Sequence, residues 1–567
     1  FRRVGSKTPG HPEYRVTPGV ETTTGPLGQG LSNAVGMAIA ERMDAATFNT
    51  PDLTIVDHYT FVLAGDGDLM EGVSYESASL AGHLGLGKLI VFFDSNAITI
   101  DGETSVAFSE DVVGRFDSAK WQVLDADPYD PESVLHAVRD AKDDENHPSL
   151  IRLTSLIGKG IARIEGTSTA HGGPLSEADA VAIREMDSAV DPFCVEPEAY
   201  HFFETQREQG ERLYEEWRER LKEYSIEYPE KYAEWTRRHD GTPMVIPETL
   251  PDYRRGELVA TRIASGRTLQ VLRQWNPNLV GGSADLTVPC FGPDLDVHYF
   301  TSTDPTGWYV PYGVREHAMA AVSNGIALHG SHRVFCGTFL AFSDYLRPSL
   351  RLSSIMGLPI VYVLTHDSIR IGEDGPTHQP VEQIASLRAM PGITVLRPAD
   401  AQETVEAWRL AAKTSDRPTA ILLTRHNVEV FPRESTLWRE EFELGAYIVA
   451  GRGPNPSLVI VATGSEVPDA LRAREMLESE QIRVISMPCR ESFLNQDEGD
   501  RAKLIPDGVP VLVVEAGSSM GWHEITRNSL RVMAMDSFGA SGPGNDVAAH
   551  FGFTAERICE EARALIG

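Results

Sequence analysis

Cysteine and long apolar runs are scarce in this 567-residue sequence. No apolar stretch approaches the ~18 residues of a membrane-spanning helix, and no apolar segment follows Phe1-Arg2-Arg3, so we expect neither a membrane partner nor a signal peptide. The cysteines are few, odd in number and without Cys-x-x-Cys spacing: Cys194, Cys290, Cys336, Cys489 and Cys559. This pattern favours free thiols in a reducing cytoplasm over disulfides or a zinc site.

Positive charge is also scarce, because 51 basic residues face 82 acidic ones and the net charge is −31. That balance argues against nucleic acid or an anionic membrane as a partner. A local arginine cluster could still bind a small phosphorylated substrate. The length predicts about three or four domains. The first residue is not methionine, so we expect that the sequence starts inside a longer product, was processed or is only partly described.

Short apolar runs alternate with helical patterns in the first part of the chain. Residues 61–64, 89–93 and 150–153 are typical of buried strands, while 31–42 and 71–84 are typical of helices. This βα rhythm predicts a parallel sheet with helices on both faces. The polar segment 204–238 predicts long exposed helices that bridge two domains, and turn residues follow it. We therefore place a domain boundary near residue 245.

Two further α/β units follow this boundary. The clearest strand patterns are at residues 361–364, 420–423, 458–462, 483–486 and 511–514. A polar, turn-rich stretch at 433–443 separates the second unit from the third. The sequence therefore predicts an α/β protein of three domains, residues 1–245, 246–436 and 437–567, with sheets that are parallel in the first two and mixed in the third.

Polar residues stand where the first two predicted strands end. Gly65-Asp66-Gly67 follows one apolar run, and Asp94-Ser95-Asn96 follows the next. Open α/β sheets bind ligands at the carboxyl ends of their strands. A carboxylate and an amide oxygen suit Mg²⁺ or Ca²⁺ holding a diphosphate, although Gly-Asp-Gly alone is also typical of an ordinary turn.

Five blocks of this sequence together resemble the transketolase family, which depends on thiamine diphosphate. They are the Asp66/Asn96 pair, Gly25-Pro26-Leu27-Gly28-Gln29-Gly30, His171-Gly172-Gly173-Pro174-Leu175, Gly313-Val314-Arg315-Glu316-His317, and Gly372-Glu373-Asp374-Gly375-Pro376-Thr377-His378-Gln379-Pro380. They stand in the family's order and span nearly the whole chain. The resemblance implies a thiamine diphosphate-binding fold: a diphosphate-binding domain ending in a helical linker, a pyrimidine-binding domain and a C-terminal domain.

The resemblance also implies which residues hold the cofactor. The metal ligands are Asp66, the Asn96 side chain and the Ile98 carbonyl, and Ala97 stands where the family more often has glycine. The other cofactor-binding residues are Gly25, Leu27, Gly67, His171, Glu316, Phe339, Phe342 and Tyr345. The last three are spaced as an aromatic stripe on a helix, which is usually core but here implies a wall around the aminopyrimidine.

Glu316 is the foremost catalytic candidate that the resemblance implies. A carboxyl that shares a proton with pyrimidine N1′ favours deprotonation of thiazolium C2 to the ylid, and a desolvated glutamate with a raised pKa suits that role. The alternative is a surface glutamate or an ion pair with Arg315. Glu71 and Glu76 match residues of a proton network that crosses the family's dimer.

Histidines and arginines in matching motifs imply the substrate site. His11, His171 and His378 join Glu316 as catalytic candidates, although a lone histidine is more often structural. The implied substrate-binding residues are His11, Arg262, His366, Asp374 and Arg425, because arginine's planar guanidinium suits a sugar phosphate and Asp374 matches a carboxylate that contacts an acceptor hydroxyl.

Three departures from the family pattern stand out. About ninety residues that precede Arg3 in the family, with two further histidines, are absent. Thr287-Val288-Pro289-Cys290 replaces a phosphate-contacting serine. Arg370 stands where a small residue is usual, and we hypothesise that it compensates for the lost serine or shifts acceptor preference.

The resemblance implies a cytoplasmic homodimer with shared active sites. It would transfer a two-carbon unit reversibly from xylulose 5-phosphate to ribose 5-phosphate, in the pentose phosphate pathway. One alternative is dihydroxyacetone synthase, which uses formaldehyde as the acceptor, and another is a truncated non-catalytic homologue. Deoxyxylulose phosphate synthases and 2-oxo-acid dehydrogenases share the glutamate chemistry but lack the block at 372–380.

Overall fold

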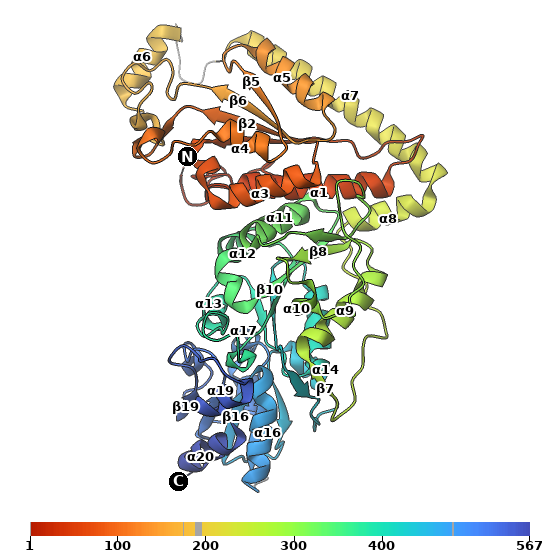
Figure 1. The fold of residues 1–567 in the computed structure, drawn as a ribbon, viewed down its shortest axis with the longest axis vertical. Coiled ribbons are helices and arrows are strands. Elements are labelled where there is room, and N and C mark those ends of the chain that lie inside the picture. The colour runs from red at the N-terminus through yellow and green to blue at the C-terminus, as the bar shows by residue number, and fades with distance from the viewer. Residues whose placement is uncertain (1, 174, 188–194, 479–480, 567) are drawn as a thin grey trace. The chain divides into compact units, whose positions relative to one another are not determined.

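The computed structural model describes residues 2–173, 175–187, 195–478 and 481–566 (Figure 1). The chain divides into two compact units. Unit 1 comprises Phe1–Thr242, Thr301–Gly307 and Leu328–Ser331, and unit 2 comprises Pro243–Phe300, Trp308–Ala327 and His332–Gly567. The predicted boundaries of three domains stay a prediction.

Unit 1 is built on a four-stranded parallel sheet in the order β1-β2-β6-β5. Its strands are β1 (Thr60–Gly65), β2 (Leu89–Ser95), β5 (Gln122–Ala126) and β6 (Ser149–Thr154), and a short hairpin pairs β3 (Ile98–Thr99) with β4 (Gly102–Glu103). The predicted strands at 61–64, 89–93 and 150–153 are thereby confirmed. β1 forms one edge, and its Phe61 and Leu63 are 48% and 83% exposed.

Helices cover both faces of this sheet. The helices and turns of this part of the chain are α1 (Gln29–Phe48), α2 (Asp66–Met70), α3 (Gly72–Leu84), α4 (Val112–Ser118), α5 (Pro131–Asp143), η2 (Ser168–Ala170) and α6 (Glu177–Asp187). α1 and α3 pack together on one side, and α5 lies on the other (Figure 1). α5 begins at Pro131, where the Asp130 carboxylate accepts the Glu132 N–H, and it packs Ala137 and Ala141 on the sheet.

Two long helices, α7 (Pro197–Glu227) and α8 (Pro229–His239), occupy the predicted helical segment. α7 is mostly exposed, as its polar sequence predicts, but Tyr224 is fully buried. Its hydroxyl donates to the Phe48 carbonyl (2.7 Å), and Trp235 of α8 packs edge-on against the Phe48 ring. These contacts fix the helical pair to the end of α1.

Unit 2 contains a six-stranded parallel sheet in the order β12-β13-β11-β10-β8-β9. The strands are β8 (Leu279–Ser283), β9 (Tyr309–Pro311), β10 (Arg333–Phe339), β11 (Ile360–Thr365), β12 (Thr394–Leu396) and β13 (Thr419–Leu423). The flanking helices and turns are α9 (Thr261–Trp275), α10 (Thr287–Phe291), α11 (Glu316–His329), η3 (Leu340–Phe342), α12 (Ser343–Met356), η4 (Ile369–Ile371), α13 (Gln383–Arg388) and α14 (Ala401–Lys413).

Four of these helices pack in two pairs, α9 with α14 and α11 with α12, which Figure 1 shows on opposite sides of the sheet. The buried Trp408 indole of α14 donates to Ser265 of α9 (2.8 Å). In the second pair, formed by α11 and α12, the Asn324 amide donates to the Ser349 carbonyl (2.9 Å). Each buried polar group therefore fixes one helix pair while satisfying its own hydrogen-bonding need.

A five-stranded sheet in the order β15-β17-β16-β18-β19 completes unit 2. Its strands are β15 (Tyr447–Ala450), β16 (Leu458–Ala462), β17 (Ile482–Ser486), β18 (Val511–Val514) and β19 (Leu530–Met533), and its helices include η5 (Gly464–Glu466), α16 (Val467–Met476), α19 (Gly544–His550) and α20 (Ala555–Ile566). Only the β15–β17 pair is antiparallel within this sheet. The predicted fold class, α/β with a mixed last sheet, is confirmed.

The structure describes four of the five cysteines, and it also shows how long and how apolar the helices are. Cys290, Cys336, Cys489 and Cys559 are free and buried, and Cys194 lies outside the described residues. Among the described residues, every helix is too short or too polar to cross a bilayer.

Candidate functional site

The two strand ends predicted as a metal site lie side by side at the carboxyl-terminal ends of the strands in the unit 1 sheet. β1 and β2 run in parallel, and Asp66 and Asn96 follow directly after them. Asp66 Oδ2 accepts the N–H groups of Asn96 (3.1 Å) and Ala97 (2.9 Å), so neither bond occupies Oδ1. Burial raises the pKa of Asp66, although these two bonds oppose the shift. The site therefore joins a buried carboxylate to the loop that follows β2.

That loop holds the neutral oxygens of the predicted metal set. Asn96 Oδ1 accepts the Ile98 N–H (3.0 Å), while Asn96 Nδ2 donates to Asp94 Oδ2 (3.2 Å), and together these bonds orient the amide. Between them, Ala97 adopts φ 60°. This left-handed conformation costs a non-glycine residue about 1–2 kcal/mol, which explains why glycine suits the position.

Glycines bring the other predicted residues of this unit close together. A Cβ added to Gly25 would lie 3.0 Å from Cγ of His11, and one added to Gly67 would lie 3.2 Å from Cδ1 of Leu27. Leu27 is half exposed. The backbone of each glycine therefore packs against the side chain of Leu27 or His11, and a larger residue at either glycine would push these segments apart.

Asp68 connects these loops and was not singled out from the sequence. Its carboxylate accepts the Gly28 N–H at Oδ1 and the Gly65 N–H at Oδ2, each at 3.0 Å. One N–H group at the start of α1, that of Gly28, is therefore bonded to a carboxylate. The signal was present, because an acidic residue three positions after a helix cap commonly bonds back to it.

The remaining candidates of unit 1 lie on its surface or on α3. His171 follows η2 and is exposed, and Pro174 of the same motif lies outside the described residues. In the part of the chain described, no hydrogen bond or ring contact joins His171 to the loop after β2, which carries Asn96 and Ile98. Glu71 precedes α3 and is exposed, while Glu76 lies within α3 and is partly buried.

The three predicted aromatic residues of unit 2 cluster, but not on one helix. Phe339 ends β10 and pairs with Thr365 of β11, Phe342 ends η3, and Tyr345 lies in the first turn of α12. The ring centroids are 6.1 Å apart for Phe339–Phe342 and 5.9 Å for Phe342–Tyr345. The predicted helical stripe is wrong because strand pairing extends through Phe339 and the helix begins only after it.

Two predicted histidines lie against this aromatic cluster. The His366 ring is 3.7 Å from that of Phe339, and the His378 ring is 5.2 Å from that of Phe342, measured between centroids. His366 follows β11 directly, is 4% exposed and has φ 62°. Thr365 Oγ1 lies 2.9 Å from its Nδ1. The end of β11 thus presents an imidazole to the aromatic wall.

Glu316 is the first residue of α11 and is partly buried. Burial raises the pKa of its carboxyl. Arg315 donates to the Tyr312 carbonyl (2.8 Å). A desolvated carboxyl of this kind can hold and release a proton closer to neutral pH than an exposed glutamate can.

A positive cluster lies beside His366. Burial, with Arg262, Arg425 and His378 nearby, lowers the pKa of His366 to about 3. Arg262 Nη1 donates to the carbonyls of Val288 (3.0 Å) and Pro289 (2.9 Å), in the segment that replaces the family's serine. That segment therefore orients a predicted anion-binding arginine although it lacks the serine hydroxyl.

Arg370 bonds to the five-stranded sheet region. Its Nη2 lies 2.5 Å from Asp469 Oδ2 and 2.9 Å from the Phe553 carbonyl, and its Nη1 donates to Asn545 (3.3 Å). These contacts do not support the hypothesis that Arg370 replaces a phosphate-binding serine. The local sequence could not reveal this, because Asp469 lies 99 positions further along the chain.

The loop that carries Asp374 is held by close contacts with the same region. Asp374 is exposed, but a Cβ added to the next residue, Gly375, would lie 2.2 Å from Ser541 Oγ. The Gln379 amide donates to the Ala540 carbonyl (3.0 Å). Gln379 belongs to the recognised block at 372–380, which was the signal for its importance.

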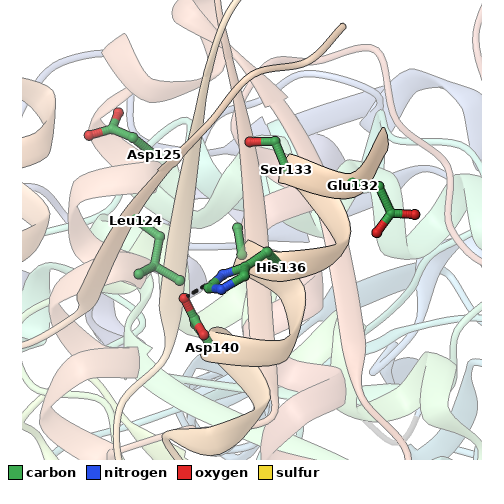
Figure 2. A pocket seen from close by; sticks show the side chains of 7 residues that line it. Leu124, Asp125, Glu132, Ser133, His136 and Asp140 are labelled. Atoms are coloured by element: carbon green, nitrogen blue, oxygen red, sulfur yellow. Dashed lines mark ion pairs between the residues drawn. The ribbon is translucent and has the colours of Figure 1, made fainter. Parts of the chain in front are cut away.

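Two hollows in the described part of unit 1 contain none of the predicted site residues. Figure 2 shows one of about 340 Å³ between β5 and α5, where His136 Nδ1 lies 3.0 Å from Asp140 Oδ2. A larger one of about 1060 Å³ lies beside β1 and includes Phe61, Leu63 and Trp217 in its lining. Among the described residues, no three His, Cys, Asp or Glu side chains gather to hold a metal, whereas the predicted set needs one carboxylate and two neutral oxygens.

Family models match three successive segments of the chain. Residues 1–243 match "Transketolase, thiamine diphosphate binding domain", residues 257–430 match "Transketolase, pyrimidine binding domain", and residues 445–554 match "Transketolase-like TK C-terminal domain".

Relatives and solved structures agree with these matches. The chain is 47% identical to a transketolase of Treponema pallidum, covering 99% of this chain and 85% of the relative, and 46% identical to one of Geobacillus stearothermophilus, covering 100% and 86%. A transketolase structure from Leishmania mexicana aligns with a TM-score of 0.96 at 42% identity, covering 100% and 84%. One from Pichia stipitis, in complex with sedoheptulose 7-phosphate, aligns with a TM-score of 0.94 at 41% identity, covering 100% and 85%.

Proposed function

The chain belongs to the transketolase family, and from this premise we propose that it transfers a two-carbon ketol unit reversibly from xylulose 5-phosphate to ribose 5-phosphate. The observation that carries the proposal is the pair of cationic residues Arg262 and Arg425 beside a buried, neutral His366 that lies against an aromatic wall. Sedoheptulose 7-phosphate, held by a solved relative, is the seven-carbon product expected from this pair.

The residues present in unit 1 fit a diphosphate cofactor held through a divalent ion. Asp66 Oδ1, Asn96 Oδ1 and the Ile98 carbonyl are hard oxygen donors, which suit Mg²⁺ or Ca²⁺. Gly25 and Gly67 carry no side chains and so leave room beside the loops that would hold the diphosphate, and the half-exposed Leu27 offers an apolar contact. Thiamine diphosphate, when bound, supplies an acidic thiazolium carbon whose carbanion accepts the two-carbon unit.

Glu316 would hold a proton at the pyrimidine nitrogen in this proposal. Its raised pKa supports that role, because a protonated carboxyl can donate where a carboxylate cannot. Phe339, Phe342 and Tyr345 would stack around the pyrimidine ring. The proposed proton carriers near the substrate are His11, His171 and His378.

The sugar phosphate would bind between Arg262, Arg425 and His366. The pKa of His366, about 3, means that this imidazole is neutral at pH 7 in the absence of an anion. A phosphate dianion there would offset the charge of the two arginines, so the cluster supplies cationic attraction together with a neutral hydrogen-bond partner. Asp374 would contact a hydroxyl of the acceptor.

The proposal is tested by measuring transfer from xylulose 5-phosphate to ribose 5-phosphate and, separately, to formaldehyde. We expect cofactor-dependent formation of sedoheptulose 7-phosphate. Preferred use of formaldehyde would favour dihydroxyacetone synthase, and absence of turnover with both acceptors would favour a non-catalytic homologue.

We also propose a homodimer in which Glu71 and Glu76 face the partner subunit. Glu71 is exposed at the start of α3, which is consistent with a contact to a second copy. Sedimentation at micromolar concentration distinguishes a dimer from a monomer. The cytoplasmic location stays a prediction.

A further inference from the structure

A buried cluster of ion pairs adjoins His366, where residues after strands of both unit 2 sheets come together. It contains two arginines and three carboxylates, each at most 6% exposed: Arg388, Arg397, Asp367, Glu466 and Glu515. Asp367 is the residue after His366, so this cluster begins one peptide bond from the proposed phosphate site.

Arg397 is the centre of the cluster. Its Nε donates to Asp367 Oδ2 (2.9 Å), and its Nη1 donates to Glu466 Oε2 (2.5 Å) and Thr463 Oγ1 (2.9 Å). Asp367 stands near the end of β11 in the six-stranded sheet, whereas Thr463 follows β16 in the five-stranded sheet. One guanidinium therefore joins the segment that carries His366 to the other sheet.

Glu515 anchors the far side of the cluster. It binds Arg388 through both oxygens (2.9 and 3.0 Å) and accepts from Thr463 (2.8 Å) and the Trp522 indole (2.9 Å). Although burial raises it, the pKa of Glu515 is lowered to about 2 by Arg388 and Arg397. Buried ion pairs of this kind often add little net stability compared with apolar packing, so a role in geometry is the more informative hypothesis.

The backbone around His366 needs such a restraint. Its φ of 62° is uncommon for a non-glycine residue, and strained residues persist where their surroundings determine the conformation. The guanidinium of Arg397 is itself closely confined, because a Cβ added to Gly464 would lie 2.7 Å from its Nε. The turn after β16 thus lies in close contact with the Arg397 guanidinium, which holds Asp367.

We propose that Arg397 is a positioning residue for His366: by holding Asp367, it keeps the neighbouring imidazole in the conformation that binds phosphate. The five-stranded sheet region has a defined part in this arrangement, since it supplies Glu466 and Thr463 to hold Arg397. The inference rests on the proposed phosphate-binding role of His366.

Two variants test this inference in different ways. Asp367→Asn removes one charge with little change in volume, and Gly464→Ala retains every charged group while displacing the Arg397 guanidinium. Arg433→Met is the matched control, because Arg433 is a second buried arginine near the same interface and pairs with Asp400 (2.8 Å) and Tyr447 (2.9 Å) instead. All three variants are made in the full chain.

The primary readout is the affinity for inorganic phosphate, titrated by ³¹P NMR without cofactor. We expect each test variant to bind phosphate at least about fivefold more weakly, while the control retains wild-type affinity and loses only thermal stability. In the loaded enzyme, KM for xylulose 5-phosphate should rise by a similar factor, and KM for the unphosphorylated donor hydroxypyruvate should not change.

Wild-type phosphate affinity in a folded test variant would overturn the inference, and so would equal weakening in the control. Failure of both test variants and the control to fold would also overturn it, because the clusters would then serve stability alone. A wild-type chain that binds phosphate but transfers nothing would contradict the proposed function, while the comparison of phosphate affinities would still decide the role of Arg397.

Discussion

The predicted site residues of unit 1 and those of unit 2 are held in contrasting ways. In unit 1, the predicted metal ligands lie on loops whose backbone N–H groups bond to Asp66, while His11, His171 and Leu27 stand exposed. In unit 2, His366 is almost fully buried between an aromatic ring and a network of ion pairs. From this difference we expect the proposed phosphate site of unit 2 to be preorganised by the protein itself.

The largest expected effect comes from the one acidic group proposed to act on the cofactor. Glu316→Gln should lower the transfer rate about a thousandfold, since a positioned general acid–base contributes 10²–10⁴. The matched control is Glu382→Gln, at an exposed glutamate of the same unit. Rates are measured at saturating cofactor, and a Glu316 variant with near wild-type activity would contradict the assigned role.

Loss of the proposed metal carboxylate, Asp66, should affect unit 1 alone. Asp66→Asn should weaken thiamine diphosphate binding in the presence of Mg²⁺ by about 100-fold, because a ligand charge is lost, while inorganic phosphate binding to unit 2 is unchanged. Fluorescence titration gives the affinity, and the exposed Asp101→Asn serves as the control. Equal cofactor affinity in both variants would show that Asp66 is no ligand.

In unit 2, substrate affinity should be sensitive to an added methyl group at Gly375, beneath the loop that carries Asp374. Gly375→Ala meets both a φ of 73° and the Ser541 hydroxyl, whereas Gly256→Ala meets a φ of 83° with no atom within 4 Å. Both variants should lose stability, but only Gly375→Ala should raise KM for ribose 5-phosphate, by about tenfold, because it displaces Asp374. Steady-state kinetics on both variants distinguish displacement of Asp374 from backbone strain alone. Equal KM values for ribose 5-phosphate in the two variants would show that Gly375→Ala does not displace Asp374.

Acid should destabilise the preorganised half. The pKa of His366 is about 3 in the folded chain and ~6.5 when unfolded, so the unfolded state binds the extra proton and stability falls as pH decreases from 6.5 towards 3. His366→Asn should flatten this decline by up to about 1 kcal/mol per pH unit. Urea unfolding between pH 7 and 5 measures the slope. An unaltered slope in the His366 variant would disprove the assignment.

The smallest effect concerns the strained backbone of Ala97, in the loop after β2. Ala97→Gly should stabilise the chain by about 0.5 kcal/mol, because relief of the left-handed strain slightly exceeds the added freedom of the unfolded chain. Ala119→Gly, at φ −82°, should destabilise it. Chemical denaturation without ligands compares the two, and destabilisation by both would show that the loop at Ala97 is not strained.

Local patterns in the sequence predicted much of the fold, because buried parallel strands such as β11 and β13 read as continuous apolar runs. They could not predict where a strand stops: the spacing of Phe339, Phe342 and Tyr345 fits a helix equally well, and pairing of Phe339 with β11 decides otherwise. Partners distant in the sequence were also missed. Nothing near Arg370 points to Asp469, and nothing near Asp367 points to Arg397.

The candidate site depended on resemblance more than on pattern. The strand ends drew attention to Asp66 and Asn96, since the carboxyl ends of parallel strands lie together, and the resemblance then implied them as metal ligands. His366 and Arg262 carry no local signal of their own, because their function arises from convergence of separate elements. Asp68 was overlooked although its spacing from Gly65 fitted a helix cap.

The most direct test of the central claim is the exchange rate of the thiazolium C2 proton of thiamine diphosphate, followed by NMR after acid quench. The wild-type chain with Mg²⁺ should accelerate exchange by orders of magnitude over free cofactor, and Glu316→Gln should abolish most of that acceleration. Exchange at the free-cofactor rate in the wild-type chain, despite bound cofactor, would contradict the account.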